Sequence, residues 1–287
     1  MMNRSSLGIG IFWLSLYAAL PSALSQDEPP EEDDNEKEGE EQGPTEREKK
    51  VLALFKASKA SFQQGRLVLT YDFETKNDEL VLDWSPRPED TKKRIRWSGK
   101  EGPTRPSKDK QGKKIEVYVP GMVIADYGQW THKAVFLPDL EVEVTIYSMA
   151  QPRAGTVVAA TFGSEQKKRA LGVNGGYQAV CVGGAKPAHL KPPLPAADRP
   201  LVRELRQTIG FHYNGKLLES YKDGKKTGDT SGSPKFTEGF GPGQVGLAWN
   251  GQVVCFIHRV TIKGRLDPDW VSAALGEKGD PKTGGKK

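Results

Sequence analysis

Short runs in which apolar and polar residues alternate dominate this chain between residues 65 and 264. In GRLVLTYDFE, for example, Leu67, Leu69 and Tyr71 occupy every second position, which is the period of a strand with one buried face. Similar runs follow, most of them bounded by Gly, Pro, Asp or Asn: DELVLDWS, KKRIRWSG, KKIEVYVPGMVIAD, HKAVFL, DLEVEVTIYSM, GTVVAATFG, RALGVNGGYQAVCVGG and LVRELRQTIGFHY. Many short strands without repeating helices predict an all-β fold, a two-sheet antiparallel β-sandwich.

Turn and helix signals complete this expectation. Asn214–Gly215 and Asn250–Gly251 lie between strand-like runs and favour two-residue type I′ hairpins, while Asp223–Gly224 marks another turn. The segment TEREKKVLALFKASKASF, residues 45–62, has apolar residues near helical spacing and acids at its start. It predicts a short N-terminal helix.

The first 25 residues have the layout of a secretory signal peptide. Arg4 precedes an apolar run from Leu7 to Leu20, and small residues follow at Ala23 and Ser25. The run is short for a membrane span, so we expect cleavage, with an uncleaved anchor as the alternative. The sequence thus predicts a secreted, periplasmic or cell-envelope protein with no membrane span once the signal is removed.

An acidic segment follows the signal peptide. Between Asp27 and Gln42 there are ten acids and one lysine, a composition that favours disorder. The predicted organisation is a signal peptide (1–25), an acidic disordered linker (26–44), a helix (45–62), a sandwich (63–266) and a mostly disordered tail (267–287). The chain beyond the linker is basic, but the cations are spread, and many fall in loop-like segments such as Ser98–Lys114. We therefore favour solvated loops over a binding patch, and expect no nucleic-acid partner for an exported protein.

Gly241, Gly243 and Gly246 match the G-x-G-x-x-G pattern of dinucleotide sites. That site needs a strand before the glycines and a helix after them, because the helix N-terminus holds the pyrophosphate. Here a strand-like run and an Asn-Gly turn follow, so the pattern predicts a β-hairpin.

Cysteine and metal chemistry are weakly signalled. Cys181 and Cys255 both lie in strand-like runs; they either form a disulfide, worth about 4 kcal/mol on the entropic model, or remain two buried thiols. The four histidines lack zinc-ligand spacing. We expect no cofactor, with calcium left open because Asp267, Asp269 and Asp126 are candidate ligands.

The stretch GQVGLAWNGQVVCFIHRVTIKG resembles the last two strands of concanavalin A-like lectin/glucanase (jelly-roll) domains, in particular the 3-keto-disaccharide hydrolase-like branch. DLEVEVTIYS, NGGYQAVCVGG and FHYNGKLLESYKDGK resemble further strands and turns of that family, so the resemblance spans about residues 65–266. It implies a jelly roll of two curved antiparallel sheets whose concave face often binds sugars. The motifs are structural, and the E-x-D-x-x-E pattern of the glucanases is absent.

Glu141 and Glu143 are the first candidates for catalysis. Two carboxylates two positions apart on a strand share a face, about 6.5–7 Å from each other, which is within the range for inverting glycosidases. Alternating apolar residues on the other face also fit a plain solvent-facing strand, which we favour. His132 is a third candidate.

The segment DYGQWTHKAVF provides the best candidate for sugar binding. Aromatic rings stack on sugar C–H faces and carboxylates accept hydroxyl hydrogen bonds. The candidates are Asp126, Tyr127, Trp130 and His132, with Trp249 near a rim. The competing interpretation places Trp130 in the core.

Three functions fit the sequence. The first, which we favour, is an exported carbohydrate-binding or adhesion module that holds a glycan on its concave face. The second is a glycoside hydrolase of the 3-keto-disaccharide type. The third is a structural or protein-interaction module with a partner in the cell envelope.

Overall fold

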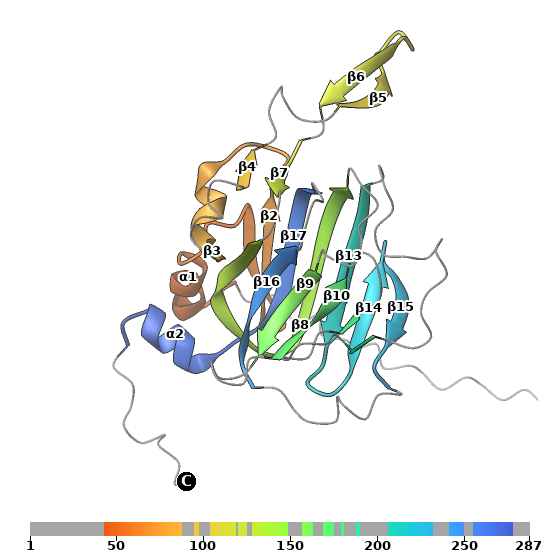
Figure 1. Cartoon of the computed structure of the whole chain (residues 1–287). Helices are drawn as coiled ribbons and strands as arrows, with labels where there is room; N and C mark the ends of the chain where they lie inside the picture. Colours follow the sequence, from red (N-terminus) through yellow and green to blue (C-terminus); the bar gives the residue numbers. More distant parts are fainter. Residues whose placement is uncertain are drawn as a thin grey trace, which may run out of the picture. The chain divides into compact units, whose positions relative to one another are not determined.

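The computed structural model describes residues 43–87, 95–97, 104–118, 120–124, 128–148, 157–162, 169–174, 179–180, 188–189, 206–231, 241–249 and 255–277. Strands dominate these residues and pair antiparallel throughout. They form two facing layers (Figure 1). The predicted two-sheet antiparallel β-sandwich is confirmed.

The first layer, which we call sheet 1, has seven strands in the order β1-β2-β17-β8-β13-β14-β15. Their bounds are β1 (Lys59–Gln63), β2 (Arg66–Asp72), β17 (Cys255–Leu266), β8 (Gly128–Ser148), β13 (Arg206–Tyr213), β14 (Leu218–Lys222) and β15 (Lys225–Asp229). At the end of β17 that begins with Cys255, β7 (Met122–Ile124) continues the edge formed by β2 and pairs with β4 (Ile95–Trp97).

The second layer, sheet 2, contains β3 (Trp84–Arg87), the first half of β8, β16 (Gly243–Trp249), β9 (Val157–Phe162) and β10 (Arg169–Asn174). Two further strand pairs form separate two-stranded sheets: β5 (Thr104–Lys108) with β6 (Lys114–Tyr118), and β11 (Ala179–Val180) with β12 (Ala188–His189).

Strand β8 joins the two layers. The run HKAVFL and residues 139–148 (DLEVEVTIYS), which look like separate strands in the sequence, both lie in this one 21-residue strand. Its first half pairs with β3 and β16, and its second half pairs with β13 and β17. Between the halves the chain turns at Asp139, whose φ of 104° is unusual for a residue with a side chain. Asp139 therefore sits where one sheet becomes the other.

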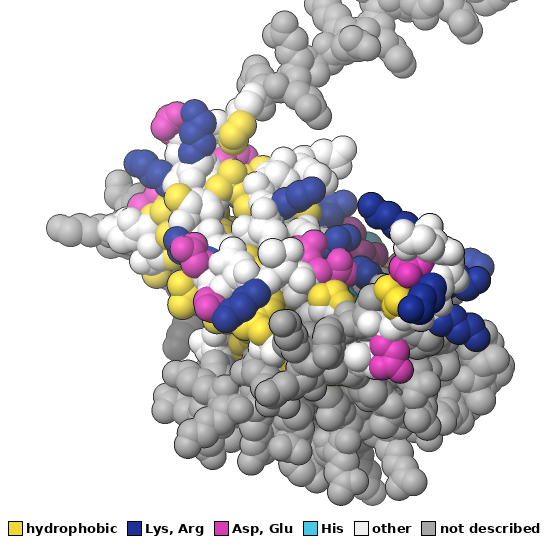
Figure 2. All heavy atoms as spheres, turned by 90° about the horizontal axis from the view of Figure 1, so that it is seen from above, with side chains coloured by type: hydrophobic (Ala, Val, Ile, Leu, Met, Phe, Trp, Pro, Cys, Tyr) yellow, Lys and Arg dark blue, Asp and Glu magenta, His cyan; other side chains and the backbone are white. Residues whose placement is uncertain are grey.

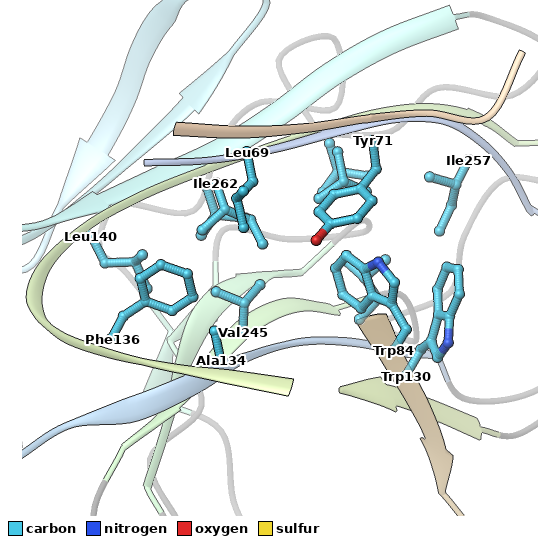
Figure 3. Packing of buried hydrophobic residues seen from close by; sticks show 14 of the residues in the cluster. Leu69, Tyr71, Trp84, Trp130, Ala134, Phe136, Leu140, Val245, Ile257 and Ile262 are labelled. Carbon is cyan, nitrogen blue, oxygen red and sulfur yellow. The ribbon is translucent and has the colours of Figure 1, made fainter. Parts of the chain in front are cut away.

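The core lies between the layers (Figure 3). Side chains of β2 and β17, such as Leu69, Tyr71 and Ile262, face Trp84, Trp130 and Val245 of sheet 2. The strict alternation in β8 buries Leu140, Val142, Val144 and Ile146 completely or nearly so. The same alternation directs Glu141 and Glu143 to the outer face of sheet 1.

The N-terminal helix is shorter than predicted. α1 spans Glu46–Leu52 and begins with a capping box between Thr45 and Glu48, but residues 59–63 form strand β1 instead of continuing the helix. The chain leaves the helix because side chains form hydrogen bonds with its backbone after Leu52. The Lys56 amide donates to Asp83, and Lys133 donates to the Leu54 carbonyl.

Two other local predictions need correction. The run DELVLDWS begins as a 3-10 helix, η1 (Asp78–Asp83), because the Asn77 side chain caps it. The tail predicted as mostly disordered contains α2 (Pro268–Ala274), whose Trp270 stacks on Phe55. Residues 278–287, the signal peptide and the acidic segment lie outside the described residues.

The hairpin turns also differ from expectation. At Asn214–Gly215 only Gly215 has positive φ. The Asn214 Oδ1 atom accepts hydrogen bonds from the backbone amides of Lys216 and Leu217. The type I′ pattern of two positive φ values occurs instead at Asp223–Gly224 and Gln64–Gly65. Asn250–Gly251 lies outside the described residues. In the part of the chain that the structure covers, no helix is both long and apolar enough to span a membrane.

Candidate functional site

The outer face of sheet 1 gathers charged side chains from five strands. Because β8, β13 and β17 pair in register, Glu141 lies between His212 and Lys263, and His212 in turn lies beside Glu219 of β14. We call this cluster the charged recess, and its members are Arg66, Asp139, Glu141, His212, Glu219 and Lys226. Figure 2 shows acidic, basic and histidine side chains together in a hollow beside the β14–β15 hairpin.

Asp139 anchors one end of the recess. Its Oδ1 atom lies 3.5 Å from Arg66 Nη2 and 3.5 Å from His212 Nε2, and its Oδ2 atom lies 3.9 Å from Arg265 Nη2. Three cationic or basic groups thus converge on one carboxylate, which the positive φ of Asp139 holds at the bend of β8. Strained non-glycine backbone is often found at functional sites.

Arg66 fixes the position of Glu141. Its Nη1 atom donates to Glu141 Oε1 at 2.6 Å, and its Nη2 atom donates to the Lys263 carbonyl at 3.2 Å. The Arg66 side chain is only 15% exposed, so this ion pair is partly shielded from water, whereas the Glu141 side chain is 36% exposed. The other oxygen, Oε2, lies 3.9 Å from Lys263 Nζ. A carboxylate that keeps this exposure between two cations can accept further hydrogen bonds.

His212 lies between two carboxylates. Its Nε2 atom faces Asp139 at 3.5 Å, and its Nδ1 atom faces Glu219 Oε2 at 3.7 Å. Both distances are long for hydrogen bonds, and the imidazole remains 32% exposed.

The far wall of the recess is a second ionic group. Glu219 accepts hydrogen bonds from Tyr221 at 2.9 Å and from Lys226, and Lys226 also pairs with Asp229 at 2.8 Å. The hydrogen bond from Lys226, followed by that from Tyr221, holds the pKa of Glu219 below its ordinary value. Burial, and then the bond to Glu219, raises the pKa of Tyr221. At neutral pH Glu219 therefore accepts hydrogen bonds and Tyr221 donates one.

Two predicted binding residues are in the core. Trp130 is 2% exposed and His132 is completely buried; Trp130 packs against Trp84 with ring centroids 4.8 Å apart. Neither side chain has surface to offer a glycan, so the competing interpretation of Trp130 is the correct one. The sequence pattern around Trp130 and His132 predicts a strand, but it does not show which face of that strand is buried.

His132 belongs to a buried polar chain instead. The Ala134 amide donates to His132 Nδ1 at 3.2 Å, so the ring proton lies on Nε2, which faces Tyr71 Oη at 2.8 Å. Tyr71 in turn donates to Asp83 at 2.6 Å, and Lys133 pairs with the other oxygen of Asp83. Burial lowers the pKa of His132 to about 3. The imidazole is thus neutral and sealed from solvent, which removes it from the catalytic candidates.

The remaining predicted residues divide into two groups. Glu141 is part of the recess, and Glu143 is exposed beside it, with its Cγ atom over Gly210. Asp126, Tyr127 and Cys181 lie outside the described residues, as do the side chains of Trp249 and Cys255, so the disulfide stays a prediction.

The described parts of the chain offer few candidate ligands for a metal ion. No three His, Cys, Asp or Glu side chains there are grouped as metal ligands. Asp267 and Asp269 lie at the start of α2, and the third calcium candidate, Asp126, is not described. Calcium therefore stays an expectation.

Sequence patterns did not identify Arg66, Asp139, His212, Glu219 or Lys226 as site residues. The available signal was the Pro138–Asp139 pair between two alternating runs, which marks a break in a strand. The partners of Asp139 are far away in the sequence, and only the strand order brings them together.

No protein-family model matches the chain, and no curated protein matches it. Several solved structures are similar. An endo-beta-1,3-glucanase from Pyrococcus furiosus is 12% identical, with 72% of this chain and 98% of that chain covered and a TM-score of 0.40. The Emp47p carbohydrate recognition domain is 15% identical over 72% of this chain and 98% of its own, with a TM-score of 0.40.

The Crh5 transglycosylase in complex with NAG is 12% identical, with 74% and 90% coverage and a TM-score of 0.42. Each of these structures is similar to this chain at low sequence identity.

Proposed function

We propose that this protein is an exported carbohydrate-binding module that holds a glycan in the charged recess of sheet 1. The observation that carries the proposal is the alternation of acceptors and donors around His212. Asp139 and Glu219 flank the imidazole, Arg66 and Lys226 flank those carboxylates, and all five side chains retain between 15% and 43% of their exposure.

A sugar matches such a surface. Each hydroxyl both donates and accepts, so a carboxylate can receive its proton while a neighbouring cation donates to its oxygen. Hydrogen bonds to charged groups are worth about 1.5–3 kcal/mol each. Because the recess is already ion-paired, its side chains are held in place before the ligand arrives, which lowers the entropic cost of binding.

Glycan hydrolysis is the second candidate. It is favoured by Glu141 and Glu143, which share the outer face at a strand spacing of about 6.5–7 Å, within the range of inverting glycosidases. The two carboxylates have different surroundings, since Glu141 pairs with Arg66 and Glu143 is exposed beside Gly210. Against it, Glu141 is placed as an acceptor, whereas hydrolysis also needs a proton donor.

A glycan array tests both candidates. The purified protein is applied with and without calcium, and every retained glycan is then analysed for cleavage. We expect retention of at least one glycan without products. Products that disappear in Glu141→Gln and Glu143→Gln would favour the hydrolase, and an array with no retained glycan would contradict both.

A further inference from the structure

The tip of the β5–β6 hairpin carries a cluster of unneutralised positive charge. The cluster, which we call the lysine tip, consists of Lys108, Lys110, Lys113 and Lys114, all exposed. Lys108 and Lys114 are direct partners in the strand register, so their side chains share a face. No ion pair joins any of the four to another residue that the structure describes.

The backbone of the tip is well defined. The Asp109 amide donates to the Lys113 carbonyl at 3.0 Å, the Gly112 amide donates to the Asp109 carbonyl at 3.0 Å, and Gly112 has the positive φ of 80° that this turn needs. The four lysines are therefore displayed on a folded turn.

The acids of the hairpin are used elsewhere. Asp109 Oδ1 accepts the amides of Gln111 at 3.0 Å and Lys113 at 2.8 Å, which holds it in the turn. Glu116 accepts a hydrogen bond from the Thr104 hydroxyl at 2.9 Å. Neither carboxylate forms an ion pair with a lysine of the tip. With four lysines and Asp109, residues 108–114 keep a net charge of 4 − 1 = +3.

Two like charges directly opposite each other destabilise a strand pair, and an isolated two-stranded hairpin is marginal in water. The repulsion between Lys108 and Lys114 therefore lowers the stability of the hairpin. A polyanion removes that repulsion, because it places negative charge between the lysines and releases its own counterions.

We propose that the lysine tip is a docking site for an anionic polysaccharide, separate from the charged recess. The recess has carboxylates facing its ligand, whereas the tip presents cations, so the tip selects sulfate- or carboxylate-bearing polymers. The acidic segment Asp27–Gln42 is the competing occupant, since it is a polyanion on the same chain.

The test is binding of the full chain to dextran sulfate and to polygalacturonate, with neutral dextran as the reference polymer. The test variant is Lys108→Gln/Lys110→Gln/Lys113→Gln/Lys114→Gln. The matched control, Lys50→Gln/Lys59→Gln/Lys76→Gln/Lys216→Gln, removes the same charge from exposed lysines elsewhere. Thermal unfolding of both variants checks that the sandwich is intact.

We expect wild type to bind at least one of the anionic polymers and not dextran. The tip variant should bind at least about tenfold more weakly and show a smaller salt dependence, by about one unit of slope per lost lysine contact at high polymer charge density. The control variant should lose less than about threefold. Equal losses in the two variants would overturn the proposal, because net charge alone would then explain binding.

A third protein separates the two occupants. In it, the acids of Asp27–Gln42 are replaced by Asn and Gln. If wild type fails to bind while this protein binds through the lysine tip, the acidic segment occupies the tip in the native chain and the proposal is overturned. If neither protein binds an anionic polymer, it is overturned as well. Both outcomes leave glycan binding by the charged recess intact, since the array tests it separately.

Discussion

At the scale of single residues, the chain uses ionisable groups in two opposite ways. The recess groups lie near solvent with partners on both sides, whereas Asp83, Tyr71 and His132 form a chain closed off from water. Burial followed by the charge of Asp83 raises the pKa of Tyr71, which keeps its hydroxyl a donor. The buried hydrogen-bonded chain therefore contributes to stability, whereas the side chains of the recess are accessible to a ligand.

Tyr71→Phe tests the buried chain. The change leaves His132 Nε2 without its partner and removes one of the two donors to Asp83 Oδ2, which keeps the Lys56 amide. We therefore expect a loss of about 1–3 kcal/mol in the free energy of unfolding, measured by urea denaturation. Tyr221→Phe removes a hydroxyl bonded to Glu219 near the surface and should cost less than about 0.5 kcal/mol. Equal losses of unfolding free energy in the two variants would show that the buried hydrogen bonds of Tyr71 contribute no more to stability than the surface hydrogen bond of Tyr221.

His132 also predicts an acid dependence. Its pKa is about 3 in the folded protein against 6.5 ordinarily, so between these values the unfolded state binds more protons. The free energy of unfolding should then fall as the pH falls from about 6.5 toward 3. In His132→Gln this contribution is absent, and the gap between variant and wild type should narrow with acidification. Parallel curves from pH 7 to pH 4 would contradict the assignment.

At the scale of elements, the bend of β8 determines where the recess lies. Gly264 of β17 packs against this bend: a Cβ atom there would lie 2.9 Å from Leu140 Cδ1 and 3.3 Å from the Asp139 carbonyl oxygen. Glycine fits this position because the Leu140 and Phe136 side chains and the Asp139 carbonyl oxygen occupy the space that a Cβ atom would take.

Gly264→Ala should accordingly destabilise the protein by about 1–3 kcal/mol through overpacking, measured by thermal or urea unfolding. Gly241→Ala is the matched control, because its Cβ atom would meet nothing within 4 Å. A Gly264→Ala protein as stable as the control would show that the bend has room to relax.

At the scale of the whole molecule, the sequence predicts the sandwich because period-2 alternation directly reports which face of a strand is buried. The prediction of a helix was wrong for residues 59–63, because pairing with β2 outweighs the weak helical spacing of their apolar residues. The sequence also could not predict the recess, whose members run from Arg66 to Lys226 and meet only through the strand order. Trp130 and His132 were misplaced since aromatic clusters look the same in a core and at a binding face.

The most direct test of the central claim compares glycan binding by Asp139→Asn and wild type. Asparagine tolerates positive φ, so the change removes the charge facing Arg66 and His212 without altering the bend. Losing one charge-assisted contact should weaken binding about 10- to 100-fold. Asp269→Asn, on exposed α2, should leave affinity within about twofold, and both variants should melt near the wild-type temperature. Unchanged glycan affinity in Asp139→Asn would contradict the assignment of the recess as the binding site.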